Sequence, residues 1–159
     1  MPSVYVWGKD TGGCLGGVPL DRENECALPT RVPGLPADAA AVACGESATA
    51  VVTRSGELWC FGAAHPRLGL GELTEPSQRI PRRVGGALEG KSVVQLSLGD
   101  SHALAVTSDG CCWAWGKGNH GCLGDGDVAL RHTRSTPTLV CRGADGQPLR
   151  PTAARRLVH

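Results

Sequence analysis

The sequence predicts an all-β fold, a partial β-propeller built from four-stranded antiparallel blades. A short strand that ends in an aromatic residue and glycine recurs, because Gly8, Gly62 and Gly116 stand 54 residues apart in each step. Between successive copies lie short apolar stretches separated by turn residues, and none has helical periodicity. The 23 glycines and 11 prolines fit many tight turns. A fixed period of this size indicates a repeat architecture, and tandem four-stranded sheets are propeller blades.

The recurring aromatic-glycine strand is the first element of each repeat. In its last copy, residues 111–116, the large side chains alternate with small ones, which predicts a strand with one large-residue face. A glycine-rich loop that closes on Leu-Gly follows each copy. We expect the tryptophans to lie in blade cores rather than to line a binding site, since they belong to alternating strands. They are Trp7, Trp59, Trp113 and Trp115.

The second element is a short strand at 29–32, 81–84 and 137–140, each beginning with proline. Proline cannot donate a ladder hydrogen bond, so it suits the start of a strand or an edge. The third element, at 40–45 and 93–99, consists almost entirely of apolar or small residues. That composition predicts strands buried on both faces.

The fourth element follows a tight polar turn. It covers 48–53 in one repeat and 102–107 in the next, and each copy leads into a hairpin turn at Gly56 or Gly110. The pairs Gly45 and Gly99, and Gly56 and Gly110, keep the spacing of 54 residues. Each repeat therefore contributes four short strands.

These motifs resemble the repeats of the regulator of chromosome condensation family. The matching segments are 42–45, 99–107 and 115–124, and the resemblance extends from residue 4 to about residue 140. It implies a propeller of this family's four-stranded blades, with seven blades expected in a complete member. The residues that carry the structural pattern are Trp7, Gly8, Gly45, Gly62, Gly99, Trp115, Gly116, Leu123 and Gly124.

The middle copy departs from the family pattern. Ala48 replaces the repeat histidine, Phe61 replaces a tryptophan, and residues 63–67 lack the glycine loop. Cys14 and Cys122 occupy the position at which the family has glutamine. We therefore expect the middle blade to be divergent.

The repeats organise the whole chain. We assign residues 1–141 to repeats, with units at about 4–57, 58–111 and a partial 112–141, and residues 142–159 to a tail or the start of a further repeat. Four blades of this length need about 216 residues, more than the 159 present. We expect missing sequence or another chain to complete the propeller, because open blades expose strand edges.

Composition excludes several classes of function. The formal net charge is +1, without the basic surplus typical of direct nucleic-acid binding, and the cluster Arg79, Arg82 and Arg83 is interpreted as a solvated edge. No stretch approaches the ~20 apolar residues of a membrane span. The N-terminal residues show no secretory leader, so we expect a cytoplasmic or nuclear protein that is not secreted. Eight cysteines are too few for a small disulfide scaffold, which favours reduced thiols.

No catalytic, metal or cofactor site is predicted. Structural zinc sites show paired ligands, whereas the cysteines here stand singly or, at 111–112, point to opposite faces. The one grouping worth testing is His120 and Cys122 with Cys14 of another blade. The neighbours Ser101 and His102 lack a nucleophile elbow and an assigned acid. The glycine-rich stretch 116–124 lacks the strand-to-helix context of a phosphate loop.

Two interpretations of His102 stay open. The repeat histidine can hold the turn by bonding to the backbone. Alternatively, the family resemblance implies that residues around this turn engage a small GTPase in the exchange-factor members, which makes Glu46, Asp100 and His102 the candidate partner-binding residues.

We favour a non-catalytic protein-interaction scaffold that binds a protein partner through blade loops. The alternative is a guanine-nucleotide exchange factor for a Ran-like small GTPase, with chromatin association. A regulatory repeat region inside a ligase, kinase or ciliary protein is a third possibility. A propeller supports any of these functions, because fold does not fix function.

Overall fold

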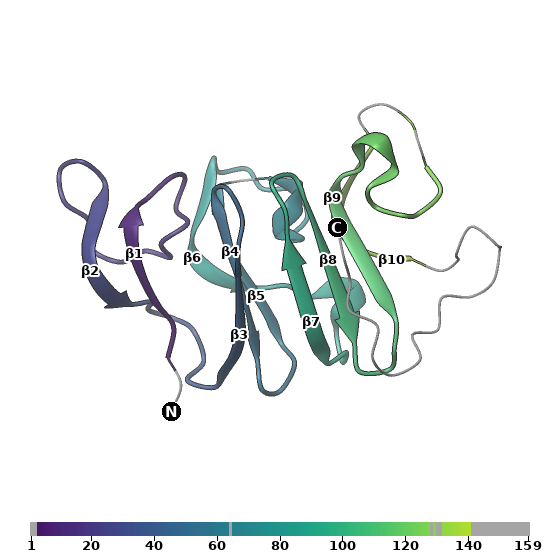
Figure 1. The fold of residues 1–159 in the computed structure, drawn as a ribbon, viewed down its shortest axis with the longest axis horizontal. Helices are drawn as coiled ribbons and strands as arrows, with labels where there is room; N and C mark the ends of the chain where they lie inside the picture. Colours follow the sequence, from purple (N-terminus) through teal and green to yellow (C-terminus); the bar gives the residue numbers. More distant parts are fainter. Residues whose placement is uncertain (1–2, 64, 128, 130–131, 141–159) are drawn as a thin grey trace.

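The computed structural model describes residues 3–63, 65–127, 129 and 132–140 (Figure 1). The secondary structure there consists of ten β-strands and three short 3-10 helices. The strands are β1 (Tyr5–Lys9), β2 (Glu25–Arg31), β3 (Ala39–Cys44), β4 (Ala48–Thr53), β5 (Leu58–Ala63), β6 (Ser77–Arg83), β7 (Val93–Leu98), β8 (His102–Thr107), β9 (Cys112–Lys117) and β10 (Thr133–Val140). The 3-10 helices are η1 (Pro66–Leu68), η2 (Gly86–Leu88) and η3 (Asn119–Gly121).

The strands form three antiparallel sheets that lie side by side (Figure 1). Strands β3 to β6 make the first blade and strands β7 to β10 the second, each paired in sequence order. Strands β1 and β2 pair only with each other and form a half-blade at the opposite end of the molecule from β10. The predicted all-β architecture of four-stranded antiparallel blades is confirmed.

The blades are offset from the sequence repeats. A repeat counted from its aromatic-glycine strand contributes β5 and β6 to the first blade and β7 and β8 to the second. Each complete blade therefore combines two strands from one repeat with two from the next. The half-blade holds the first two strands of the first repeat.

The three prolines of the outer strands lie within those strands, so the prediction that they begin them is wrong. Pro29, Pro81 and Pro137 lie inside β2, β6 and β10, each at a shift of register against the aromatic-glycine strand. A bulge leaves residues without a ladder partner, so a residue lacking an N–H loses nothing there. The strands consequently extend several residues before each proline.

Two clusters of buried side chains join the three sheets. One spans both blades and includes Trp113 and Trp115. The other joins the half-blade to the first blade through four residues, Val4, Val32, Val51 and Phe61. Every residue of β4 is buried, as are the four central residues of β9, so these inner strands form the core.

Two expectations about burial are wrong. Strands β3 and β7 are exposed at positions such as Val42 (50%) and Val94 (55%), because each pairs on one side only. Trp7 is 62% exposed although Trp115, at the equivalent position, is fully buried. Cys44, the last residue of β3, is exposed as well, whereas in β5 burial raises the pKa of the Cys60 thiol to about 12.

Candidate functional site

The β3–β4 and β7–β8 turns meet at one end of the blades. A Cβ added at Gly45 would lie 2.9 Å from the Gly99 carbonyl oxygen, so the two turns are in contact. Each turn is closed by the same backbone bond, from the Gly45 amide to the Ala48 carbonyl and from the Gly99 amide to the His102 carbonyl, both at 2.9 Å. The first turn closes with alanine at the position of the repeat histidine, so closure does not require an imidazole.

Two of the three predicted site residues, one on each turn, act electrostatically on the same cation. Glu46 and Asp100 are exposed at the tips of the two turns, and both carboxylates act on the guanidinium of Arg67. Burial lowers the pKa of Arg67, and the two carboxylates raise it. The Arg67 residue is only 2% exposed, and its Nη2 donates to the Ser47 hydroxyl.

His102 occupies a different environment from the two carboxylates. It is the first residue of β8, is half-buried, and lies opposite Gly116 in the β8–β9 register. The two backbones approach closely, because a Cβ added at Gly116 would lie 2.5 Å from the His102 Cα. The glycine of the aromatic-glycine pair is therefore required by this contact and by its φ of +111°.

Sequence reasoning missed Arg67, which lies in the divergent loop after β5. His65 caps η1, since its Nδ1 accepts a hydrogen bond from the Arg67 amide at 3.3 Å. Pro66 begins the turn and Gly69 ends it in the left-handed region, at φ +69°. The signal in the sequence was a charged residue before Leu-Gly, where the other two copies have cysteine.

The imidazole of His65 is neutral near pH 7. Burial and the positive charges of Arg67 and Lys117 lower its pKa to about 4. A neutral ring is also what the cap requires, because a protonated Nδ1 cannot accept a hydrogen bond.

The same loop holds the next blade in place. The Trp115 indole Nε1 donates to the Arg67 carbonyl at 2.7 Å, and a Cβ added at Gly69 would lie 2.8 Å from that nitrogen. The half-blade and the first blade meet in the same way, with the Phe61 ring against Gly16.

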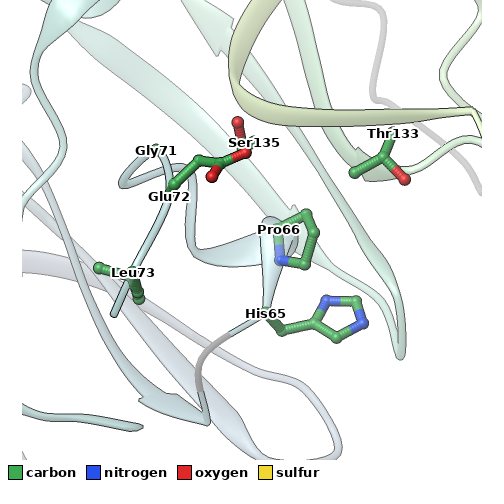
Figure 2. A pocket seen from close by; sticks show the side chains of 7 residues that line it. All are labelled: His65, Pro66, Gly71, Glu72, Leu73, Thr133 and Ser135. Atoms are coloured by element: carbon green, nitrogen blue, oxygen red, sulfur yellow. The ribbon is translucent and has the colours of Figure 1, made fainter. Parts of the chain in front are cut away.

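A cleft of about 350 Å³ lies between this loop and β10 of the second blade (Figure 2). Its lining is mixed, with an imidazole, a carboxylate, two hydroxyl groups and apolar side chains. On one side the Gly71 amide donates to the Ser135 carbonyl at 2.9 Å. The lining residues are His65, Pro66, Gly71, Glu72, Leu73, Thr133 and Ser135.

A polar cluster that the sequence did not reveal ties the β9–β10 loop to β10. The buried His132 ring lies with Nε2 2.8 Å from an Asp125 oxygen and Nδ1 2.7 Å from an Asp127 oxygen. Arg134 lies 3.2 Å from Asp125 and places a positive charge beside that carboxylate. The cluster is built from neighbouring residues and holds one loop.

The described residues contain no cluster of three or more His, Cys, Asp or Glu side chains that could hold a metal ion. The Cys14 and Cys122 thiols each donate within their own loop, to the Lys9 and Lys117 carbonyls. In the same part of the chain, none of the helices has the length and apolar character needed to cross a membrane.

The chain is similar to several known proteins. It is 35% identical over 147 residues to RCC1 domain-containing protein RUG3, mitochondrial, of Arabidopsis thaliana, covering 89% of this chain and 32% of the relative. It is 33% identical to the human E3 ubiquitin-protein ligase HERC2 over 148 residues, covering 92% of this chain and 3% of the ligase. It is 35% identical to the Ultraviolet-B receptor UVR8 of Arabidopsis thaliana over 139 residues, covering 86% of this chain and 30% of the receptor. The chain thus spans about a third of RUG3 and much less of the ligase.

Solved structures share the fold. Human WBSCR16 superposes with a TM-score of 0.73 at 23% identity, over 86% of this chain and 34% of that one. Prp20p of Saccharomyces cerevisiae superposes with a TM-score of 0.73 at 20% identity, over 88% of this chain and 34% of that one. The sequence model of the regulator of chromosome condensation (RCC1) repeat matches residues 3–52, 55–106 and 109–150, and a second model of the same repeat matches 93–122. The chain therefore belongs to the RCC1 repeat family.

Proposed function

We propose that the chain is a non-catalytic protein-interaction scaffold that binds a protein partner through its blade loops. The partner-binding surface is the turn end of the two blades, with Glu46, Asp100 and His102 as the contacting residues. Binding there needs no covalent step, no cofactor and no metal.

The contact between the two turns is the observation that carries this proposal. Two carboxylates from turns 54 residues apart face solvent on adjoining blades. The cation on which both carboxylates act, Arg67, is buried and donates to Ser47 of the first turn. A charged surface fixed on rigid strand ends suits recognition of a protein partner, because little conformational entropy is lost on binding.

Quantitative affinity capture from the source cells tests the proposal. The bait is the chain with both Glu46→Ala and Asp100→Ala, compared with the unchanged chain. The matched control is Arg54→Ala, which changes one exposed charge in the β4–β5 turn at the other end of the first blade. We expect a discrete set of proteins to be lost with the double variant and kept with the control. Equal recovery with all three baits would refute a partner site at this end.

Guanine-nucleotide exchange on a small GTPase is the second candidate, and one observation favours it. Prp20p, whose fold this chain shares, has binding properties to Gsp1p and histones. Exchange would operate by stabilising the nucleotide-free GTPase through differential binding.

Release of a labelled guanine nucleotide from Gsp1p, with and without the chain, tests this second candidate. We expect acceleration that Asp100→Ala or His102→Ala reduces and Arg54→Ala does not. Release at the intrinsic rate in the presence of the chain would exclude exchange activity of this segment.

Cytoplasm and nucleus are the compartments in which we propose that this interaction takes place. Fluorescence microscopy of the tagged protein in its own cells tests this. The relative RUG3 carries the word mitochondrial in its name, so a mitochondrial signal is the outcome that would overturn the proposed compartment.

A further inference from the structure

The cleft between the loop after β5 and β10 is a built feature of the two blades. Its volume of about 350 Å³ lies at the lower end of the range for ligand-binding pockets, which is about 300–1,000 Å³. One wall belongs to the first blade and the other to the second (Figure 2). The two walls are joined to each other, because the Gly71 amide donates to the Ser135 carbonyl at 2.9 Å. The shape of the cleft is therefore set by backbone hydrogen bonding between the blades.

The cleft lies between the two blades and away from the faces on which a further blade would pack. Thr133 and Ser135 line it on the face of the second sheet that meets the first blade. They lie at the start of β10, where Thr133 pairs with Lys117, whereas Val140 at the other end of the strand pairs with Cys112. A blade added after the second would pack on the opposite face of this sheet.

One end of the cleft carries an unpaired carboxylate. Glu72 is exposed and forms no ion pair with the described residues. Figure 2 shows its carboxylate extending towards Ser135. Glu75, three residues further along the same loop, is also exposed and without an ion pair among the described residues. This end of the cleft is consequently negative and suits a basic group.

The other end of the cleft carries a hydrogen-bond donor and a cation. Figure 2 shows the His65 ring on the far side of Pro66 from the carboxylate. The His65 Nδ1 accepts from the Arg67 amide, so the proton of the neutral ring is on Nε2, which is left to donate. Lys117, opposite Thr133 in the β9–β10 register, is exposed and forms no ion pair with the described residues. Burial, Arg67 and Lys117 lower the pKa of His65 to about 4, which places the Lys117 ammonium near that ring.

We propose that the cleft binds an extended segment of a partner protein that places a basic side chain at Glu72 and a carboxylate at Lys117. The His65 Nε2–H donates to a carbonyl oxygen of the segment, and Pro66 and Leu73 contact its aliphatic groups. Opposite charges at the two ends fix the direction in which the segment lies. Glu72 and Lys117 are both exposed, so the segment can continue beyond each end of the cleft. This inference does not rest on the proposed turn-end site, with which the cleft shares no residue.

Selection of random heptapeptides displayed on phage against the purified chain tests the proposal. We expect the selected sequences to share a Lys or Arg that lies within a few residues of an Asp or Glu. The strongest binder is then synthesised with blocked ends, and isothermal titration calorimetry gives its affinity. Glu72→Gln and Lys117→Gln should each weaken binding by about tenfold or more, because each removes one charge-assisted contact.

The matched control is Glu75→Gln, which removes an exposed carboxylate from the same loop but not from the lining of the cleft. Nitrogen–proton correlation spectra show whether each variant is folded, and the peptide should shift the amide signals of Gly71, Leu73 and Ser135. Glu72→Lys should lose binding of the selected peptide and recover it when the basic residue of the peptide is replaced by Glu. A role of Glu72 in folding alone would not give that recovery. The double variant of the turn-end site should bind the peptide with unchanged affinity, which separates the two sites.

Several results would overturn the proposal. They are a selection that yields no peptide or peptides without the two opposite charges, equal affinities of the unchanged, Glu72→Gln and Glu75→Gln chains, and amide shifts confined to the turn end. Free lysine and free glutamate, used as single amino-acid probes, should bind at least about tenfold more weakly than the peptide, because each can occupy only part of the cleft. Equal binding of a free amino acid would indicate a small-molecule site and would overturn the assignment to a partner segment.

Discussion

Neighbouring sheets are joined at two contacts, one between the half-blade and the first blade and one between the two blades. Both contacts pack an aromatic ring on a glycine and satisfy a loop carbonyl, but they use different side chains. At the first, Phe61 packs on Gly16 and the Thr49 hydroxyl donates to the Cys14 carbonyl at 2.9 Å. At the second, Trp115 both packs on Gly69 and donates to the Arg67 carbonyl.

The two contacts differ at a pair of residues that lie opposite each other in neighbouring strands. Thr49 lies opposite Phe61 in the β4–β5 ladder, and Ala103 lies opposite Trp115 in the β8–β9 ladder. The phenyl ring of Phe61 has no N–H to donate, so the Thr49 hydroxyl donates the hydrogen bond that the Trp115 indole donates at the second contact. A buried carbonyl left without a partner costs about 1–3 kcal/mol, so the satisfied carbonyl is what both contacts preserve.

Removing the ring at the second contact should have the largest effect. Trp115→Ala leaves a cavity in a fully buried site, and we expect the free energy of unfolding to fall by about 3–5 kcal/mol. Trp115→Phe keeps most of the packing but leaves the Arg67 carbonyl without its hydrogen-bond donor. We expect the free energy of unfolding to fall by about 1–3 kcal/mol. Urea unfolding followed by circular dichroism measures both. Equal losses for the two variants would show that the hydrogen bond, and not the ring volume, dominates.

The glycine beneath the ring offers the next test. Gly69→Ala places a Cβ 2.8 Å from the Trp115 Nε1, whereas Gly124→Ala has its nearest neighbour at 3.5 Å. Both residues have similar positive φ, +69° and +64°, so the backbone strain is shared. We expect Gly69→Ala to destabilise the chain by about 1–3 kcal/mol more than Gly124→Ala, from overpacking. Urea unfolding at low protein concentration measures both variants. Equal losses of unfolding free energy would contradict a steric clash between the added Cβ and Trp115.

The exchange between Thr49 and Phe61 predicts coupling. Thr49→Ala should lower the free energy of unfolding by about 1–2 kcal/mol, because it leaves the Cys14 carbonyl without a hydrogen-bond donor. Adding Phe61→Trp restores a donor, so the double variant should be more stable than the sum of the single changes by roughly 0.5–2 kcal/mol. A double-mutant cycle of unfolding free energies gives the coupling directly. A coupling of zero would mean that the indole does not reach the carbonyl at this contact.

The smallest expected effect belongs to His65, which caps the loop of the second contact. Its pKa is about 4 in the folded chain, below the ordinary value of 6.5, so the unfolded chain binds the proton more readily. The contribution of His65 to stability should be fully present above pH 6.5 and should fall as the pH drops towards 4. We expect a loss of only about 1 kcal/mol, because solvent screens the charge on a half-buried ring.

The matched control is His65→Asn, which caps without titrating in this range. The difference in unfolding free energy between the two chains should shrink or reverse between about pH 7 and about pH 4.5. A difference that is independent of pH would contradict the capping role.

Periodicity was enough to predict the sheets, because the strand pattern and the glycine spacing are local properties of the sequence. The ends of the outer strands were not predictable in the same way. Pro81 is typical of a strand start, but it lies at a bulge whose position depends on the register between β5 and β6. The exposure of Trp7 likewise depends on what lies beside it, which its own strand cannot reveal.

The positions of the candidate site residues were predictable in part. Glu46 and Asp100 occupy equivalent turns, so the repeat alone places them at one end of the blades. Arg67 could not be found from the repeat, because its loop is the one that departs from the pattern and its burial arises from packing between blades. The polar cluster around His132 was missed for the same reason, since its partners come together only when the loop folds.

The offset between repeats and blades has a consequence for how such chains change length. A cut at a repeat boundary, before β5 or after β8, separates the first two strands of a blade from its last two strands. The two half-blades left at such cuts are complementary. Recombination that inserts or deletes one 54-residue unit therefore rejoins half-sheets of matching kind, and every strand recovers a neighbour of the right type. Blade number can change by one without the invention of a new interface, and the aromatic-on-glycine contact is reused at each addition.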